Sequence, residues 1–354
     1  MKSDEKSNNS RSNISDNLSP YISIVIFSHH SRKEYLKEAI ESAINQTLPR
    51  SLYEIIVVKD YQDPPLEKFL LGNGVINIMS NDSFYDYLYN AVNASRAEII
   101  SFLDDDDLFL PEKMAKVHEI FKDNKINVYR NLNFFFSRDI KLDEYNQRHL
   151  EEFKSIFGSH LGLVNIEMFK KNPSLVEHLS NNSSISIRKK TLYAYIEIMK
   201  TNKAGIGFDN ILILIGLETG LAIDSNILTK ERIHRNNLYG FTLGGHEFAT
   251  RYYWQLRAYS QSVSLILNDT TVVNARVIVK FTYLTALVRL RVFNIQNNKD
   301  DLKWKDYFIF VFSMIFAYKK FKFYYVVSLI EPVQLRIAMS KFYFNHLFKP
   351  VIAP

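Results

Sequence analysis

The sequence predicts an α/β fold with a largely parallel sheet, followed by a helical region. Short apolar, β-branched runs occur at residues 21–27, 54–58 and 99–103, and residues 76–79 are a further candidate. Runs of this length are typical of strands that are buried on both faces of a sheet. Helical spacing of apolar residues separates them at residues 34–46 and 84–94. Strands that alternate with helices in this way predict a mostly parallel sheet flanked by helices.

The composition sets wide bounds on the class of protein. The chain has 354 residues, of which 47% are hydrophobic, and it contains no Cys. This length and hydrophobicity allow one large domain with an appendage, or two domains. The absence of Cys excludes disulfides, thiolate nucleophiles and zinc sites with Cys ligands.

Three segments differ in character along the chain. Residues 1–20 are polar with mixed charges, so we expect a disordered tail and no secretory signal. Residues 21–243 contain the alternating strands and helices of the expected domain. From Glu247 onward the pattern changes to long helical stretches rich in Tyr, Phe and Val, so we place a boundary near Gly244 and assign residues 244–354 to an aromatic, basic helical region.

The end of this helical region accounts for most of the net positive charge of the chain. The net charge is +6, and residues 301–354 contain eight Lys or Arg residues and three acids. Residues 304–325 have aromatic and basic ends around an apolar centre of about twelve residues, whereas a membrane-spanning helix needs roughly 20. We therefore expect no transmembrane helix. Two interpretations stay open: an interfacial helix on an anionic membrane surface, or a helical subdomain that packs on protein. We expect no nucleic-acid partner, because the lysines lie among apolar runs suited to burial.

Four consecutive acids, Asp104 to Asp107, follow the apolar run at residues 99–103. His29 and Asp60 also follow predicted strands, and in open α/β sheets ligands bind outside the carboxyl ends of the strands. Four adjacent carboxylates repel one another unless a cation lies among them. Oxygen ligands suit Mg²⁺ or Mn²⁺, which also bind phosphate. The alternative is a solvated acidic turn before a helix that begins at Pro111.

The order of these motifs resembles the inverting family 2 glycosyltransferases of the GT-A fold. The resemblance covers residues 21–237 and rests on YISIVIF, EIIVVKD, Asn90 and FLDDDDLFLP. It implies a mixed, mostly parallel sheet and transfer of a sugar from a nucleoside-diphosphate sugar to a hydroxyl acceptor, with Mg²⁺ or Mn²⁺ as cofactor. A UDP-sugar is the expected donor, with GDP- or dTDP-sugars as alternatives. The acceptor would be a glycan or a lipid-linked glycan.

On the donor side, the resemblance assigns Asp106 as the direct metal ligand. Asp104 would contact ribose or metal-bound water and complete the metal site. Asp60 would accept a hydrogen bond from the base of the nucleotide. The other residues expected on the nucleotide sugar are Ser28, His29, Asn90 and Asp105. For Asp107 the alternative is a cap of the next helix.

On the acceptor side, the resemblance assigns Asp209 as the general base of inverting transfer. An N-cap role for this residue is the alternative, and both roles are compatible. Ser183, Ser184 and Arg232 would contact the sugar or the acceptor. Within the segment Arg232 to Asn237, which resembles the R-x-H-x-x-N motif of the family, His234 would complete the metal shell or hold the diphosphate.

Four residues depart from the family pattern: Phe27, Lys59, Tyr89 and Phe208 stand where Pro, an acid, Arg and Glu are usual. These departures leave the identity of the nucleotide open, and two alternative functions remain. One is a nucleotidyltransferase-type metal-phosphate enzyme on a similar sheet. The other is a catalytically silent, membrane-associated binding or scaffold protein. For the transferase we expect a cytoplasmic location, peripheral at the cytoplasmic membrane face.

Overall fold

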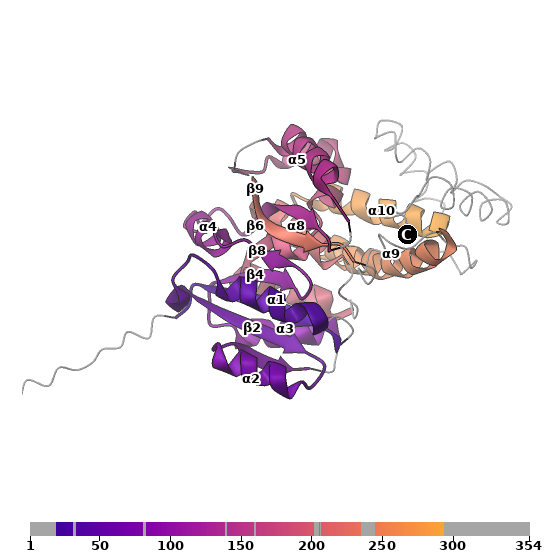
Figure 1. Cartoon of the computed structure of the whole chain (residues 1–354). Helices are drawn as coiled ribbons and strands as arrows, with labels where there is room; N and C mark the ends of the chain where they lie inside the picture. Colours follow the sequence, from indigo (N-terminus) through magenta and orange to yellow (C-terminus); the bar gives the residue numbers. More distant parts are fainter. Residues whose placement is uncertain are drawn as a thin grey trace, which may run out of the picture.

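The computed structural model describes residues 19–30, 33–80, 83–138, 140–158, 161–201, 205, 207–234 and 245–293. In this part of the chain one sheet of nine strands forms the centre, and helices cover both of its faces (Figure 1). The strand order is β3-β2-β1-β4-β8-β6-β9-β5, and β7 also pairs with β9. The predicted α/β architecture is therefore confirmed.

The first half of the sheet is parallel. It contains β1 (Ile22–Ser28), β2 (Tyr53–Lys59), β3 (Ile76–Met79) and β4 (Ile99–Asp104). Each strand agrees with its predicted run to within one residue. In the pairing, Ser28 lies beside Lys59, and Phe27 lies beside Asp104. The carboxyl ends of β1, β2 and β4 therefore meet at one edge.

Alternate side chains of these strands enter different cores, which explains why the runs are apolar throughout. On one face, β1 packs with α1 (Lys33–Ile44), α2 (Pro64–Gly72) and α4 (Lys113–Ile120). On the other face it packs with α3 (Phe84–Ala94) and α8 (Phe208–Thr219). Ile24 and Val25 illustrate the division, since each is fully buried and each belongs to a different core.

The second half of the sheet is mixed. β8 (Ile185–Arg188) lies antiparallel between β4 and β6 (Val128–Phe136), and β6 runs parallel to β9 (Leu221–Arg232). The shorter elements here are β5 (Leu108–Phe109), α5 (Asp143–Phe157), β7 (Gly162–Leu163), α6 (Ile166–Lys171), η3 (Pro173–Leu179), η4 (Asn182–Ser184), α7 (Lys189–Tyr195) and η5 (Ile196–Thr201). The short 3-10 helix η2 (Arg50–Leu52) precedes β2 in the first half.

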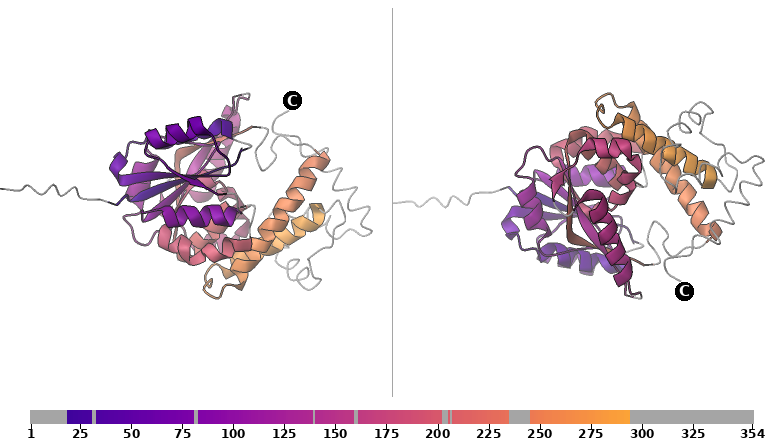
Figure 2. Two further views of the ribbon diagram at one scale, coloured as in Figure 1. Left: turned by 90° about the horizontal axis from the view of Figure 1, so that it is seen from below. Right: turned by 90° about the horizontal axis from the view of Figure 1, so that it is seen from above.

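Two long helices follow the sheet, α9 (Gly245–Asn268) and α10 (Arg276–Phe293), and they lie side by side at one side of it (Figure 2). Val263 of α9 and Ile278 of α10 are fully buried in the same core as α8. Among the described residues, no helix combines the length and the apolar character needed to cross a bilayer. Residues 1–18, 235–244 and 294–354 lie outside the described part, so the polar tail, the boundary near Gly244 and the interfacial helix stay predictions.

One predicted helix start is wrong. The helix after the acids begins at Lys113, and Glu112 is its N-cap, so neither Pro111 nor Asp107 begins it. The chain first forms the short strand β5 against β9, which uses the backbone groups of residues 108–109. This strand separates the acids from the helix, and the cap interpretation of Asp107 is excluded.

Candidate active site

The residues predicted on the donor side gather at the carboxyl edge of the parallel strands. Ser28 ends β1, Lys59 ends β2 and Asp104 ends β4. His29, Asp60 and the remaining acids each follow directly. The parallel register fixes this gathering, because β1 pairs with both of its neighbours up to its last residues.

The four acids divide into two groups. Asp104, Asp106 and Asp107 each offer a carboxylate oxygen, and these oxygens all lie within 4.8 Å of one another. Asp106 and Asp107 are buried, with 5% and 2% of their surface exposed. Asp105 points elsewhere, since its Oδ2 accepts a hydrogen bond from the backbone N–H of His29 at 3.2 Å. We call Asp104, Asp106 and Asp107 the acid cluster.

Asp107 is the most deeply held member of the acid cluster. Its Oδ2 accepts a hydrogen bond from Ser183 Oγ at 2.7 Å, and its Oδ1 accepts one from the backbone N–H of Arg232 at 2.9 Å. Burial, and then the neighbouring Asp106 carboxylate, raise the pKa of Asp107 well above its usual value. Ser183 Oγ also accepts the N–H of Asp104 at 2.9 Å, so this predicted sugar-side residue braces the cluster.

The end of β9 closes the cluster from the other side. Nε2 of His234 lies 3.0 Å from Oδ2 of Asp106, and its ring lies against Tyr35 of α1. Arg232 donates from Nε to the carbonyl oxygen of Asp106 at 2.8 Å and pairs with Glu38 at 2.6 Å. Through these contacts Arg232 links the acid cluster to α1. Its predicted role toward sugar or acceptor stays a prediction.

A buried lysine lies beneath the acids, and the sequence analysis missed it. Lys113, at the start of α4, is fully buried. Its Nζ donates to Asn131 Oδ1 at 2.8 Å, to Thr229 Oγ1 at 3.0 Å and to the carbonyl oxygen of Ser183. Burial lowers the pKa of Lys113 well below its usual value, and the nearby Asp107 acts in the opposite direction. In the sequence it looks like an ordinary helix lysine, so no signal indicates its burial.

Asp209 lies in the first turn of α8 and is 3% exposed. Gly207 is the N-cap, in the left-handed conformation with φ 72°, so the N-cap interpretation of Asp209 is wrong. Burial raises the pKa of Asp209 to about 6, while the hydrogen bond from the Asn210 N–H and the nearby Arg130 oppose the shift. A general base works best with a pKa near the operating pH, so the environment suits that role.

A further buried carboxylate, Glu231 of β9, was not predicted. Its Oε2 accepts hydrogen bonds from Asn133 Nδ2 at 2.7 Å and from Asn181 Nδ2 at 3.0 Å. Burial, and then the nearby Asp104 and Asp106, raise the pKa of Glu231 to about 8. The charge of Asp209 adds to this rise in the pKa of Glu231, because the two carboxyl groups are near enough to interact.

Arg130 of β6 completes this buried network. It is fully buried, and its Nη2 donates to Oδ1 of Asn133 at 2.9 Å. Burial lowers the pKa of Arg130 to about 10, and the Glu231 charge opposes that shift. Arg130 is a charged residue within β6, and Glu231 lies in the charged run of residues 230–232 that ends β9. The position of Arg130 inside an otherwise apolar and amide-rich strand is a signal that could have indicated it, whereas the charged end of β9 suggests an exposed Glu231.

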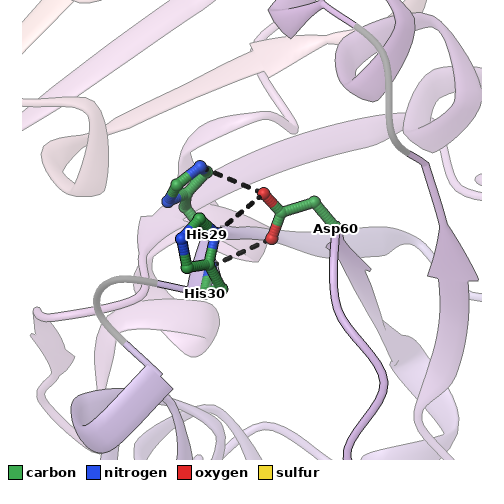
Figure 3. Close-up of side chains that lie close together, drawn as sticks. All are labelled: His29, His30 and Asp60. Carbon is green, nitrogen blue, oxygen red and sulfur yellow. Dashed lines mark hydrogen bonds and ion pairs between the residues drawn. The ribbon is translucent and has the colours of Figure 1, made fainter.

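The donor side is more open. His29 Nε2 lies 3.0 Å from Oδ2 of Asp60, and the backbone N–H of His30 donates to Oδ1 of Asp60 at 2.9 Å (Figure 3). Side-chain exposure is 51% for His29 and 65% for His30. Ser28 is buried, and its Oγ lies 3.1 Å from the hydroxyl of Tyr61.

Two predicted residues lie apart from these contacts. Asn90 lies in the second half of α3, and within the described residues no hydrogen bond or ion pair joins it to the acids. Ser184 Oγ donates to Asn181 Oδ1 at 2.7 Å and is fully buried. Ser184 therefore supports Asn181, and a direct contact with sugar or acceptor stays a prediction.

The departures from the family pattern have a structural explanation. Lys59 is fully buried and pairs with Glu67 of α2 at 2.9 Å, so its charge is neutralised away from the acids. Phe27 and Phe208 both pack on Phe84, with ring centroids 5.3 Å and 5.0 Å from it. Phe208 thereby anchors the start of α8, directly before Asp209. Tyr89 is 37% exposed, and its ring stacks on that of Tyr85, one turn earlier in α3, with ring centroids 5.8 Å apart.

The chain matches proteins of known family. Residues 23–165 match the model of the family described as glycosyl transferase family 2. A relative from Methanocaldococcus jannaschii, described as an uncharacterized glycosyltransferase, is 28% identical over 188 residues. That alignment covers 49% of this chain and 57% of the relative, so it spans little more than half of that protein.

Two solved structures share the fold. TarS of S. aureus, residues 1–349 in complex with UDP-GlcNAc, matches with a TM-score of 0.53 and 14% identity, over 92% of this chain and 89% of TarS. A mannosyltransferase of Pyrobaculum calidifontis, in complex with GDP-Man and Mn²⁺, matches with a TM-score of 0.51 and 10% identity, over 94% of this chain and 88% of that one.

Proposed function

We propose that this protein is an inverting, metal-dependent glycosyltransferase, because residues 23–165 match the model of glycosyl transferase family 2 and the fold resembles those of TarS and of a mannosyltransferase. It would move a sugar from a nucleoside-diphosphate sugar to a hydroxyl of a glycan or a lipid-linked glycan. The family and the fold support glycosyl transfer itself. The inverting outcome, the metal and the acceptor are the proposed part.

The observation that carries the proposal is the acid cluster. Three carboxylate oxygens lie within 4.8 Å of one another, and two of the three residues are buried. Such crowding of like charge is costly unless a cation joins it. Carboxylate oxygens with one imidazole, from His234, fit Mg²⁺ or Mn²⁺. When bound, the cation would stabilise the negative charge on the departing nucleoside diphosphate.

The protein residues would divide the remaining work. Asp60 would accept a hydrogen bond from the base of the nucleotide. Asp209 would take the proton of the acceptor hydroxyl as its oxygen attacks the anomeric carbon, on the face opposite the departing diphosphate. With a pKa of about 6, Asp209 is deprotonated at neutral pH and is still basic enough for this step. Attack from the opposite face inverts the anomeric centre.

The solved neighbours support a class of donor for this protein. The two solved neighbours carry UDP-GlcNAc and GDP-Man, which supports a nucleoside-diphosphate sugar here. We favour a UDP-sugar, with GDP- and dTDP-sugars as alternatives. A lipid-linked acceptor would suit membrane contact through residues 301–354 and a peripheral position at the cytoplasmic membrane face.

The test is a panel of sugar nucleotides with Mn²⁺, with and without chelator, for wild type and Asp106→Ala. We expect one donor to release nucleoside diphosphate, and the release to disappear with chelator and in the variant. Release of pyrophosphate would instead identify a nucleotidyltransferase. If no donor reacts and metal-dependent nucleotide binding is absent as well, the scaffold alternative replaces the enzyme.

A further inference from the structure

Two histidines and one acid converge outside the acid cluster. His29, His30 and Asp60 each offer one ligand atom, and these atoms lie within 4.8 Å of one another (Figure 3). We propose that these residues form a binding site for a transition-metal ion such as Zn²⁺, and that this metal and the donor nucleotide exclude each other. The exclusion rests on the proposed function, because Asp60 is the residue assigned to the base. The metal site does not.

The backbone brings the three residues together. β1 and β2 pair in parallel up to Ser28 and Lys59, so the residues that follow leave the sheet side by side. The Asp60 carboxylate is 16% exposed, whereas both imidazoles are more than half exposed. A rigid acid therefore lies next to two rings that solvent ions can reach.

The separations match a tetrahedral site. His29 Nε2 lies 3.0 Å from Asp60 Oδ2, and His30 Nδ1 lies 3.4 Å from the same oxygen. With zinc–ligand bonds of about 2.0–2.1 Å, ligand atoms at tetrahedral corners are about 3.3–3.4 Å apart. An ion can therefore replace the protons that now link the rings to the carboxylate with only small side-chain movements.

The surrounding contacts orient the ligands. The His30 N–H donates to Asp60 Oδ1 at 2.9 Å, which leaves Oδ2 directed at the two rings. The His29 N–H donates to Asp105 Oδ2 at 3.2 Å and holds the loop against β4. Hydrogen bonds that fix a ligating carboxylate and its neighbours in this way are typical of functional metal sites.

The ligand set also selects the metal. Two imidazoles and a carboxylate favour Zn²⁺, Co²⁺, Ni²⁺ or Cu²⁺, whereas Mg²⁺ prefers oxygen ligands. The site is thus chemically distinct from the acid cluster. Three protein ligands leave a fourth position for water. A metal held on Asp60 Oδ2 occupies the carboxylate that the nucleotide base would use, so the two ligands compete.

The test is a calorimetric titration of the full chain with Zn²⁺ alone, without nucleotide. Wild type and Asp106→Ala, which lacks the main ligand of the acid cluster, should both bind zinc at this site. His30→Asn and Asp60→Asn should each weaken that binding at least about tenfold. The matched control is His178→Asn, because His178 is a half-exposed histidine 4.0 Å from a single carboxylate of Glu152. The zinc affinity of His178→Asn should equal that of wild type.

Competition is tested by UDP binding, or GDP binding if the donor panel selects it, at fixed free zinc. Zinc should weaken nucleotide binding in wild type and much less in His30→Asn. The nucleotide itself chelates zinc to the same extent in both experiments. The informative quantity is therefore the difference between wild type and His30→Asn in how far zinc weakens nucleotide binding. Equal zinc affinity in wild type and His30→Asn overturns the metal site. Equal loss of nucleotide binding overturns the exclusion. Because the zinc titration uses neither donor nor turnover, a missing transferase activity leaves the metal site standing.

Discussion

The two ends of the site differ in their contact with water. At the donor end, His29 and His30 are more than half exposed, and their partner Asp60 lies at the surface edge of the sheet. At the other end, Asp107 and Asp209 are almost completely buried, and burial raises the pKa of each. Under the proposed function, the exposed end would recognise the nucleotide and the buried end would carry out the chemistry.

An exposed end can exchange ligands, because its polar groups remain solvated when no ligand is present. At the buried end, the loss of hydration destabilises the charged carboxylates. Protonation or a bound cation relieves this destabilisation, so these groups respond to both. This comparison predicts that changes at the buried end alter rate or stability, whereas changes at the exposed end alter affinity.

The largest effect is expected from Asp209→Asn. The amide keeps the shape of the side chain and removes the base, so transfer should fall by about 10²- to 10⁴-fold. Donor binding should persist, because the resemblance places Asp209 on the acceptor side. Steady-state transfer and UDP affinity measure the two quantities.

Glu218→Gln is the control for this variant. Glu218 lies at the other end of α8, where it accepts hydrogen bonds from Asn274 and the Ala275 N–H. This variant should transfer at the wild-type rate. Near-wild-type transfer by Asp209→Asn would remove that residue from the mechanism.

The next effect is on stability, from Lys113→Met. Methionine fills the buried space but removes the three hydrogen bonds that Lys113 Nζ donates to Asn131, Ser183 and Thr229. Thr229 Oγ1 still accepts from Asn131 Nδ2 and still donates to the Ser183 carbonyl oxygen, so Asn131 Oδ1 is the acceptor that is left without a donor among the described residues. The unfolding free energy should fall by about 3 kcal/mol, since three buried hydrogen bonds are lost at about 1 kcal/mol each. Denaturant titration measures it.

Lys116→Met on the same helix is the matched control. Lys116 makes a surface pair with Glu119 at 3.2 Å, and such pairs contribute at most about 1 kcal/mol. If Lys113→Met and Lys116→Met lower the free energy of unfolding equally, the buried hydrogen bonds of Lys113 contribute no more to stability than a surface ion pair does.

The sequence predicts the donor end better than the buried end, and the reason is physical. Strand runs such as residues 21–27 and 99–103 are apolar because both faces are covered, so local composition reveals them. The residue that follows each strand then lies at the ligand edge by topology alone. Hence the placement of His29, Asp60 and Asp104 at one edge follows from short stretches of sequence.

Lys113, Arg130 and Glu231 could not be predicted in the same way. Their burial depends on contacts with residues distant in the chain, such as Lys113 with Thr229. A charged residue near a strand or helix end is normally solvent-exposed, so local sequence favours the wrong environment for each. The N-cap at Gly207 and the start of α4 at Lys113 were missed because turn geometry, here a left-handed glycine and the strand β5, decides both.

At the exposed end, Asp60→Asn should weaken nucleotide binding without loss of stability. One hydrogen bond to a charged group contributes about 1.5–3 kcal/mol, so affinity should fall about tenfold to a hundredfold. Titration with UDP, or with the nucleotide that the donor panel selects, measures this change. His178→Asn, remote from the edge, should bind as wild type does. An unchanged affinity would mean that the base lies elsewhere.

The smallest effect is a dependence of stability on pH without metal. Burial and nearby acids raise the pKa of Glu231 to about 8, well above that of an unfolded chain, so folding favours its protonated form. The unfolding free energy of metal-free protein should therefore fall as the pH rises from 6 to 8, by about 2 kcal/mol. Glu231→Gln should flatten this slope, because the amide does not titrate. Added Mn²⁺ should also remove it, since a cation at the acid cluster favours the charged carboxylates. Denaturant titrations at pH 6, 7 and 8 distinguish these cases, and a slope that persists in Glu231→Gln would assign it to another buried acid.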